Sequence, residues 1–175
     1  MRPYDYSAVR KGYLPPNGVK VLFIGESAPN PRSGEIRFFY HPILRSADNL
    51  FRGLMLALYD ADKQALASTP KAQWLDRFQR DGYYLDDLCG EPVNHLPPPE
   101  RSRARRAAVK NLLRRIHALS PRGIIICHQG VYGDIGDLLR ANRLPVLQTE
   151  PIPFPLGNYR IRFADAVRAA LARLP

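Results

Sequence analysis

Cysteine and histidine are scarce in this chain of 175 residues, which contains two cysteines and four histidines. Cys89 and Cys127 are too few for a four-cysteine iron–sulfur cluster, and the histidines do not fall at zinc-ligand spacing around them. Such sparse cysteine is typical of a reducing cytoplasm, where we expect both thiols to be buried rather than bridged. We therefore predict no metal ion and no bound cofactor.

Long hydrophobic runs and targeting segments are also missing. No apolar stretch approaches the length of a membrane-spanning helix, and no signal peptide or lipidation motif is visible. We therefore expect a cytoplasmic, nucleoid-associated protein that does not bind membranes. A phosphate loop of the Gly-x-x-x-x-Gly-Lys type is absent as well, so a hydrolase or transferase for a small phosphorylated ligand ranks last among the functions considered.

Acidic residues are outnumbered, since 16 Asp and Glu stand against 26 Lys and Arg, and the formal net charge is +10 with a pI near 10.0. Clustered Lys and Arg release counterions from phosphate backbones, so this excess predicts a polyanionic partner. DNA, single-stranded or duplex, is the leading candidate. The alternative is a basic surface that serves solubility. The length suits one domain over residues 1–175, and we expect a monomer.

Short apolar runs alternate with segments of helical periodicity along the chain. The apolar runs predict strands at 21–24, 83–89, 122–127 and 144–149. The periodic segments predict helices over 46–58, 70–82, 100–119, 131–141 and 164–174. Strands that are each followed by a helical crossover predict a three-layer α/β/α sandwich with a short four-stranded parallel sheet. Residues 1–18 are predicted to form an irregular arm packed on the domain.

The first strand leads into Gly25-Glu26-Ser27-Ala28-Pro29, and Phe38-Phe39-Tyr40 follows a short polar loop. We expect Gly25 to let the backbone turn sharply. Ligands of open α/β sheets bind just outside the carboxyl ends of the strands, so Glu26 is a candidate catalytic carboxylate at that edge. The alternative is an ordinary loop or helix-start carboxylate.

These residues together resemble the first motif of the uracil-DNA glycosylase superfamily, and Arg45-Ser46-Ala47-Asp48-Asn49-Leu50 is similar to the segment that opens the family's first helix. The resemblance implies one glycosylase-like domain with the strand order 2-1-3-4. It also implies that Glu26 activates water, that Phe39 stacks on an extruded base and that Ser27 helps to bind that base. The iron–sulfur branch of the family needs four cysteine ligands, so a cluster of that kind is not expected here.

The strand at 83–89 carries the neighbouring carboxylates Asp86 and Asp87. Together with Glu26 they could form a Mg²⁺ site. Neighbouring strand residues point to opposite faces, however, and cannot both reach one ion without distortion. In the glycosylases an Asn on this strand hydrogen-bonds the base. The resemblance places Asp86 at that position, with Asp87 one residue away. An ionised Asp only accepts hydrogen bonds, so uracil selectivity does not carry over.

The helix at 100–119 carries the densest positive charge, and its first turns hold Arg101, Arg103, Arg105 and Arg106. The helix dipole disfavours positive charge at this end, so a functional reason for the cluster is worth considering. A helix that follows a parallel strand begins at the edge that holds Glu26, and we therefore predict that these arginines hold DNA phosphates. The alternative is a solvated helix face.

His128 follows the strand at 122–127 and is a candidate acid or base at the same edge, although a lone His in a turn often caps or packs. The Pro-rich segment 150–163 stands where the superfamily has a His-containing loop that enters the minor groove. Phe154, flanked by prolines, suits a wedge for the gap left by an extruded nucleotide. The remaining DNA-binding candidates of this segment are Asn158, Arg160 and Arg162. The alternative is a proline-rich turn that only packs.

The leading hypothesis is a DNA glycosylase-like enzyme that extrudes a damaged or deaminated base, uracil or a related one, and hydrolyses its N-glycosidic bond in base-excision repair. The second hypothesis is a catalytically inactive nucleic-acid-binding protein that retains the fold. The missing Asn and His favour the second hypothesis, whereas Glu26 and Phe39 favour the first.

Overall fold

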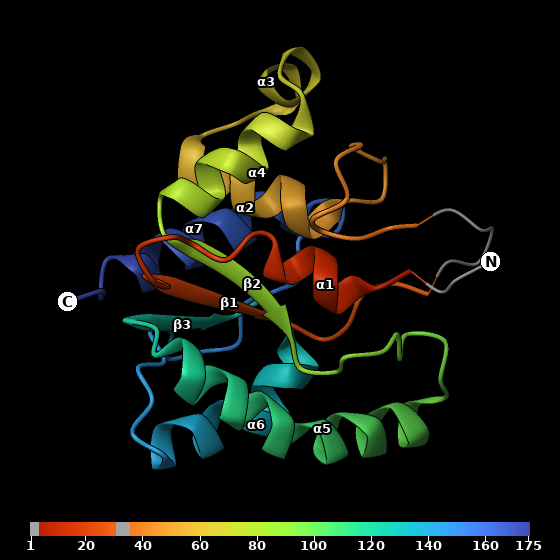
Figure 1. Ribbon diagram of the computed structural model, residues 1–175, viewed down its shortest axis with the longest axis vertical. Helices are drawn as coiled ribbons and strands as arrows, with labels where there is room; N and C mark the ends of the chain where they lie inside the picture. The colour runs from red at the N-terminus through yellow and green to blue at the C-terminus, as the bar shows by residue number, and fades with distance from the viewer. Residues whose placement is uncertain (1–3, 31–35) are drawn as a thin grey trace.

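The sheet and its helices are seen in a computed structural model that describes residues 4–30 and 36–175. In chain order the elements are α1 (Tyr6–Lys11), β1 (Val21–Gly25), α2 (Asn49–Tyr59), α3 (Lys63–Ser68), α4 (Lys71–Arg80), β2 (Tyr83–Asp87), α5 (Pro98–Leu119), β3 (Gly123–Ile126), α6 (Gln129–Ala141) and α7 (Tyr159–Leu171). The protein is an α/β protein whose three parallel strands lie in the order β2-β1-β3. Helices α2, α4 and α7 lie on one side of the sheet and α5 and α6 on the other (Figure 1).

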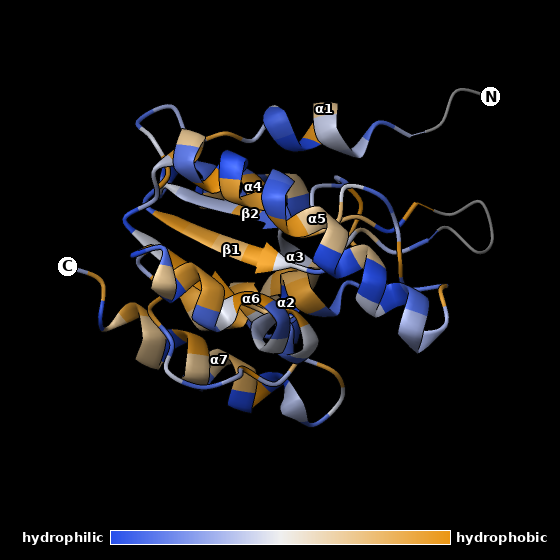
Figure 2. Cartoon of the chain, turned by 90° about the horizontal axis from the view of Figure 1, so that it is seen from below, coloured by the Kyte–Doolittle hydropathy of each residue, from blue (hydrophilic) through white to orange (hydrophobic). Residues whose placement is uncertain are grey.

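The central strand β1 is buried along its whole length, which explains its unbroken apolar run. It pairs in parallel with β2 and with β3, and Figure 2 shows this hydrophobic strand enclosed by the helices. Because all three strands run the same way, their carboxyl ends meet at one edge of the sheet. That edge is the structural basis of the candidate site.

The predicted fourth strand at 144–149 is wrong, because only Val146 pairs, in an isolated parallel bridge to Ile124 of β3. Beyond this bridge the side chain of Gln148 takes the place of a backbone strand. Its Oε1 accepts a hydrogen bond from Ile126 N at 2.6 Å, and its Nε2 donates to Ile126 O at 2.9 Å. One amide side chain thus satisfies the edge groups that another strand would have paired.

The N-terminal arm is not irregular throughout, since its described part contains the short helix α1; residues 1–3 lie outside the described residues. Asp5 caps this helix through a 2.8 Å hydrogen bond from Ala8 N to its carboxylate. Arg10 of α1 is 7% exposed and forms ion pairs with Asp87 at 2.6 Å and Asp86 at 3.4 Å. The helix therefore brings a buried cation to the two acids of β2.

Two further differences concern helices. The short helix α3 follows an Asp62 cap and was not expected, and α7 begins at Tyr159 rather than at 164.

Both cysteines are free and buried, as predicted. Within the described ranges, no helix combines the length and the hydrophobicity that crossing a membrane requires.

Candidate functional site

A pocket of about 450 Å³ opens at the carboxyl edge of the sheet. Its apolar lining includes Phe38, Phe39, Leu50, Phe51, Leu85, Phe154 and Leu156. Its polar lining includes Glu26, Ser27, Arg37, Asp87, Asn94, Arg101 and His128. A cavity of this volume, with mostly apolar walls and a few polar groups, is typical of a small-molecule site and can hold one or two aromatic rings.

Gly25, the last residue of β1, is required for space rather than for a turn. Its φ is not positive, and a Cβ at this position would lie 2.4 Å from Asp87 Oδ1. Asp87 is the parallel partner of Gly25 across the β1–β2 pair. The missing side chain thus lets the Asp87 carboxyl lie against the end of β1, where both residues line the pocket. The chain bends at the next residue, Glu26, so the change of direction expected at Gly25 comes one residue later.

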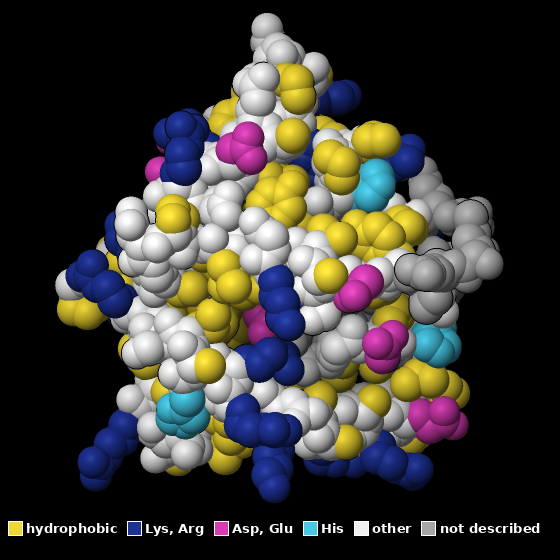
Figure 3. Space-filling model, viewed as in Figure 1, with side chains coloured by type: hydrophobic (Ala, Val, Ile, Leu, Met, Phe, Trp, Pro, Cys, Tyr) yellow, Lys and Arg dark blue, Asp and Glu magenta, His cyan; other side chains and the backbone are white. Residues whose placement is uncertain are grey.

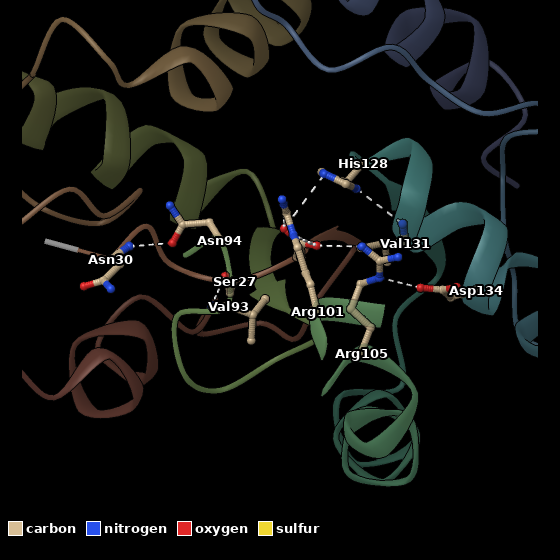
Figure 4. A network of polar contacts seen from close by, with 10 residues as sticks. Ser27, Asn30, Val93, Asn94, Arg101, Arg105, His128, Val131 and Asp134 are labelled. Atoms are coloured by element: carbon tan, nitrogen blue, oxygen red, sulfur yellow. Dashed lines mark hydrogen bonds and ion pairs between the residues drawn. The ribbon is translucent and has the colours of Figure 1, made fainter. Parts of the chain in front are cut away.

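Glu26, the next residue, is held by two arginines of α5. Arg101 donates from Nε to Glu26 Oε1 at 2.7 Å and from Nη2 to the second carboxylate oxygen, and Arg105 Nη1 donates to Oε1 at 2.9 Å. The Glu26 side chain is only 6% exposed. Arg101, Arg105 and His128 point toward this one carboxylate (Figure 4). The carboxylate is therefore ionised, buried and bonded at both oxygens.

The pKa of Glu26 reflects opposing effects. Burial alone would raise the pKa, but the hydrogen bonds from Arg101 and Arg105 and the nearby positive charge outweigh burial and lower the pKa below its ordinary value. A carboxylate in this state stabilises positive charge nearby but is a weak proton acceptor. In this arrangement Glu26 would activate water poorly.

The two arginines are anchored differently. Arg105 also donates from Nε to Asp134 Oδ2 of α6 at 2.5 Å, so it is held from both sides. Arg101 has Glu26 as its sole hydrogen-bond or ion-pair partner in the described part of the chain, and its side chain is 30% exposed. Their spacing of four residues places both on one face of α5. That spacing is the sequence signal that these two arginines act together.

His128 is the N-cap of α6, and its Nδ1 accepts a hydrogen bond from Val131 N at 3.3 Å. In the neutral ring the hydrogen is then carried by Nε2, which lies 3.9 Å from Glu26 Oε2. Burial lowers the pKa of His128, and Arg101 and Arg105 add to this effect against the opposing charge of Glu26. The ring is therefore neutral at pH 7 and presents an N–H toward the carboxylate.

Of the two acids considered on β2, Asp87 lines the pocket and Asp86, the predicted base-binding residue, does not. Asp86 is bound instead by Arg115 Nε of α5 at 2.6 Å. Burial raises the pKa of Asp87 to about 6 despite the neighbouring charge of Arg10. Among residues 4–30 and 36–175, no three His, Cys, Asp or Glu side chains gather as metal ligands would.

The other predicted base-binding residues reach the pocket. Ser27 lines it and accepts a 3.2 Å hydrogen bond from Val93 N to its Oγ. Phe39 lines it with 8% of its surface exposed, and its ring packs edge-on against Phe51 at 5.6 Å between centroids. Asn94, which we did not single out as a site residue, also lines the pocket, and it accepts a 2.8 Å hydrogen bond from Asn30 N.

The predicted DNA-binding residues separate into two groups. Phe154 and Arg101 line the pocket, and the Phe154 ring lies 6.1 Å from that of His128. The others lie outside the pocket lining. On α5, Arg103 and Arg106 are exposed, and Arg105 binds Glu26. Asn158 and Arg160 line a separate groove beside α3, and Arg162 is exposed over the Tyr159 ring.

Comparison of the sequence with protein-family models and with curated proteins finds no match. The likeness to the uracil-DNA glycosylases therefore rests on the motif residues around Glu26 and Phe39.

Proposed function

We propose that this protein is a DNA glycosylase-like enzyme that takes an extruded nucleotide into the pocket and hydrolyses its N-glycosidic bond. The observation that carries the proposal is the convergence of Glu26, Phe39, His128 and Phe154 on one pocket. These residues come from four separate parts of the chain. A carboxylate can stabilise the charge that develops on the sugar, an imidazole N–H can bond the departing base, and aromatic rings can stack on an extruded base.

The sheet is compatible with the glycosylase fold. Its order β2-β1-β3 matches the first three positions of the family order 2-1-3-4, and Val146 lies beside β3 where the fourth strand would be. The glycosylase fold is thus part of the proposal, with the Gln148 side chain in place of the last strand pairing.

The base would lie between apolar walls. Phe39 and Phe154 line the pocket, and stacking of a base on one aromatic ring contributes about 1–3 kcal/mol. Asp87 offers only acceptor oxygens when it is ionised, so it favours a base that presents an N–H group to it. Asn94 adds an amide that both donates and accepts.

The chemistry would take place beside Glu26. As the C1′–N bond breaks, its electron pair leaves with the base, and the carboxylate stabilises the positive charge that develops on the sugar. A water oxygen bonds to C1′ and transfers its proton to Glu26. The Nε2–H of His128 donates a hydrogen bond to the departing base anion, which takes its proton from solvent.

A row of exposed cations on α5 would bind the DNA backbone. Arg103, Arg106, Lys110 and Arg114 are exposed and follow one another at spacings of three or four residues, which places them on one helix face. Figure 3 shows Lys and Arg side chains gathered over the part of this view where α5 lies in Figure 1. Such a row supplies sequence-independent affinity that weakens as salt is raised.

The arginine pairing of Glu26 favours one alternative, a protein that binds an extruded or single-stranded nucleotide without cleaving it. A carboxylate that accepts three hydrogen bonds from arginines and has a lowered pKa is a poor base. The two functions differ in a single readout, the release of base.

The test is incubation of the purified protein with duplex and single-stranded oligonucleotides that carry uracil, hypoxanthine, xanthine or a mismatch, followed by alkaline cleavage at abasic sites. We expect strand breaks with at least one lesion. Glu26→Gln should reduce them at least about 100-fold and leave DNA affinity nearly unchanged. Glu100→Gln, at an exposed position on α5, is the matched control and should retain activity. Binding without strand breaks on any substrate would establish the binding-only alternative.

A further inference from the structure

The pocket contains a contact that opposes its proposed chemistry. Glu26 must accept a proton from water, yet both of its oxygens receive hydrogen bonds from Arg101. Arg105 donates to Oε1 as well. Three of the roughly four acceptor positions of the carboxylate are thus occupied. Its side chain is 6% exposed and its pKa is lowered, so Glu26 is a poor base in this arrangement. An active site built this way requires an event that removes one arginine.

Arg101 and Arg105 differ in how firmly they are held beside Glu26. Arg105 is fixed by a second carboxylate, Asp134, and its side chain is 15% exposed. Arg101 lies at the pocket wall, is 30% exposed and has no second partner among the residues that the structure describes. It also lies at the N-terminal end of α5, which carries the exposed cations Arg103 and Arg106. Arg101 is therefore the one an incoming anion reaches.

We propose, as an extension of the glycosylase function above, that a phosphate of the DNA backbone takes Arg101 from Glu26 and thereby releases the carboxylate to activate water. The guanidinium binds phosphate and carboxylate through the same bidentate pair of N–H groups, so the exchange replaces one charge-assisted pair by another. Glu26 keeps one hydrogen bond, from Arg105, which holds it in place. Water activation is thus confined to the DNA-bound protein.

The exchange should raise the pKa of both candidate catalytic groups, Glu26 and His128. The groups that act on Glu26 are Arg101 and Arg105 of α5 and His128 at the start of α6, and Glu26 in turn acts on Cys89 after β2. Removing Arg101 takes away a hydrogen bond and a charge that lower the pKa of Glu26, so this pKa rises. It also takes away a charge that lowers the pKa of His128. Both groups then accept protons more readily.

The experiment follows the Glu26 carboxyl directly, by carbon-13 NMR titration of labelled glutamate side chains, with and without an oligothymidylate of about 12 nucleotides. The oligonucleotide should raise the Glu26 pKa in the native protein. In Arg101→Gln this pKa should already be high without DNA and should not move when DNA is added. Arg80→Gln, at an exposed arginine of α4 outside the pocket lining and outside the row of cations on α5, should behave as the native protein does.

Two measurements accompany the titration. Arg101→Gln should lower the slope of log affinity against log salt by about 0.7, the value for one lost phosphate contact on a single strand. Arg101→Lys keeps the charge without the bidentate pair, and it should fall between the native protein and Arg101→Gln in the Glu26 titration. Thermal unfolding checks that both variants fold.

The outcomes separate this inference from the proposed function. Bound oligonucleotide with an unchanged Glu26 titration overturns the exchange, even if base release is observed. A raised Glu26 pKa without base release from any lesion keeps the exchange and removes the enzymatic function. Failure of the native protein to bind either the oligonucleotide or duplex DNA overturns both.

Discussion

Arg10 of α1 is predicted to be a principal source of stability for the sheet edge beneath the pocket. It is buried and pairs with Asp87 at 2.6 Å, while Asp86 has a second partner in Arg115. Arg10→Met keeps an unbranched side chain of similar length, which preserves packing, and removes the charge. The Asp87 carboxylate is then left buried with no ion-pair partner among the described residues.

The size and pH dependence of this effect follow from the burial of Asp87. Breaking a buried ion pair from one side costs about 3–5 kcal/mol, and we expect the lower value because Asp86 remains paired. The folded pKa of Asp87, about 6, is above its ordinary value of 3.8. Protonation of Asp87 thus stabilises the fold fully below pH 3.8, and this contribution is lost as pH rises through 6. Without Arg10 the pKa rises further, so the mutant is least stable near neutral pH.

The assay is urea and thermal unfolding at pH 7.5 and pH 5. At pH 7.5 we expect a loss of about 3 kcal/mol, which for a chain of this length lowers Tm by about 10 °C. At pH 5 the loss should be clearly smaller, because Asp87 is then neutral. Arg114→Met, at an exposed position, is the matched control and should change stability by less than about 0.5 kcal/mol. A loss below about 1 kcal/mol at pH 7.5, or one equal at both pH values, would refute the reasoning.

Two further predictions concern packing at the same sheet. Gly25→Ala should lower the free energy of unfolding by about 1–3 kcal/mol, because the new Cβ would lie 2.4 Å from Asp87 Oδ1. Unfolding in urea measures this loss, and an unchanged midpoint would contradict the prediction. Gly133→Ala, in α6 with open space around the new Cβ, is its control and should stabilise by up to about 1 kcal/mol. Gln148→Met removes both hydrogen bonds to Ile126 and should lower the free energy of unfolding by about 2 kcal/mol. It should also speed hydrogen exchange of the Ile126 amide, and native exchange rates would count against this role of Gln148.

The elements that local patterns define were predictable. The strands β1 and β3 follow from apolar runs, and α5 follows from its periodic apolar face, because these signals lie within one segment. The pocket edge followed from the parallel arrangement, which brings Glu26 and His128 together from distant positions. These predictions needed only the direction of the strands.

The features that depend on long-range pairing were not predictable from local patterns. Arg10 becomes buried only because two acids of β2 need a cation, and nothing near Arg10 in the sequence indicates this. Gln148 replaces a strand through side-chain hydrogen bonds that have no period. Motif counting could not decide which of Asp86 and Asp87 lines the pocket, because a shift of one residue in a strand reverses the face on which a side chain lies.

The most direct measurement of the central claim, that the pocket receives an extruded nucleotide, is the fluorescence of 2-aminopurine placed beside a lesion in duplex DNA. Glu26→Gln is used so that the base is bound and not released. Extrusion unstacks the probe, so its fluorescence should rise on binding, and Phe39→Ala should reduce the rise because the base loses its stacking partner. A gel shift with unchanged fluorescence would show that DNA binds without base extrusion and would contradict the account.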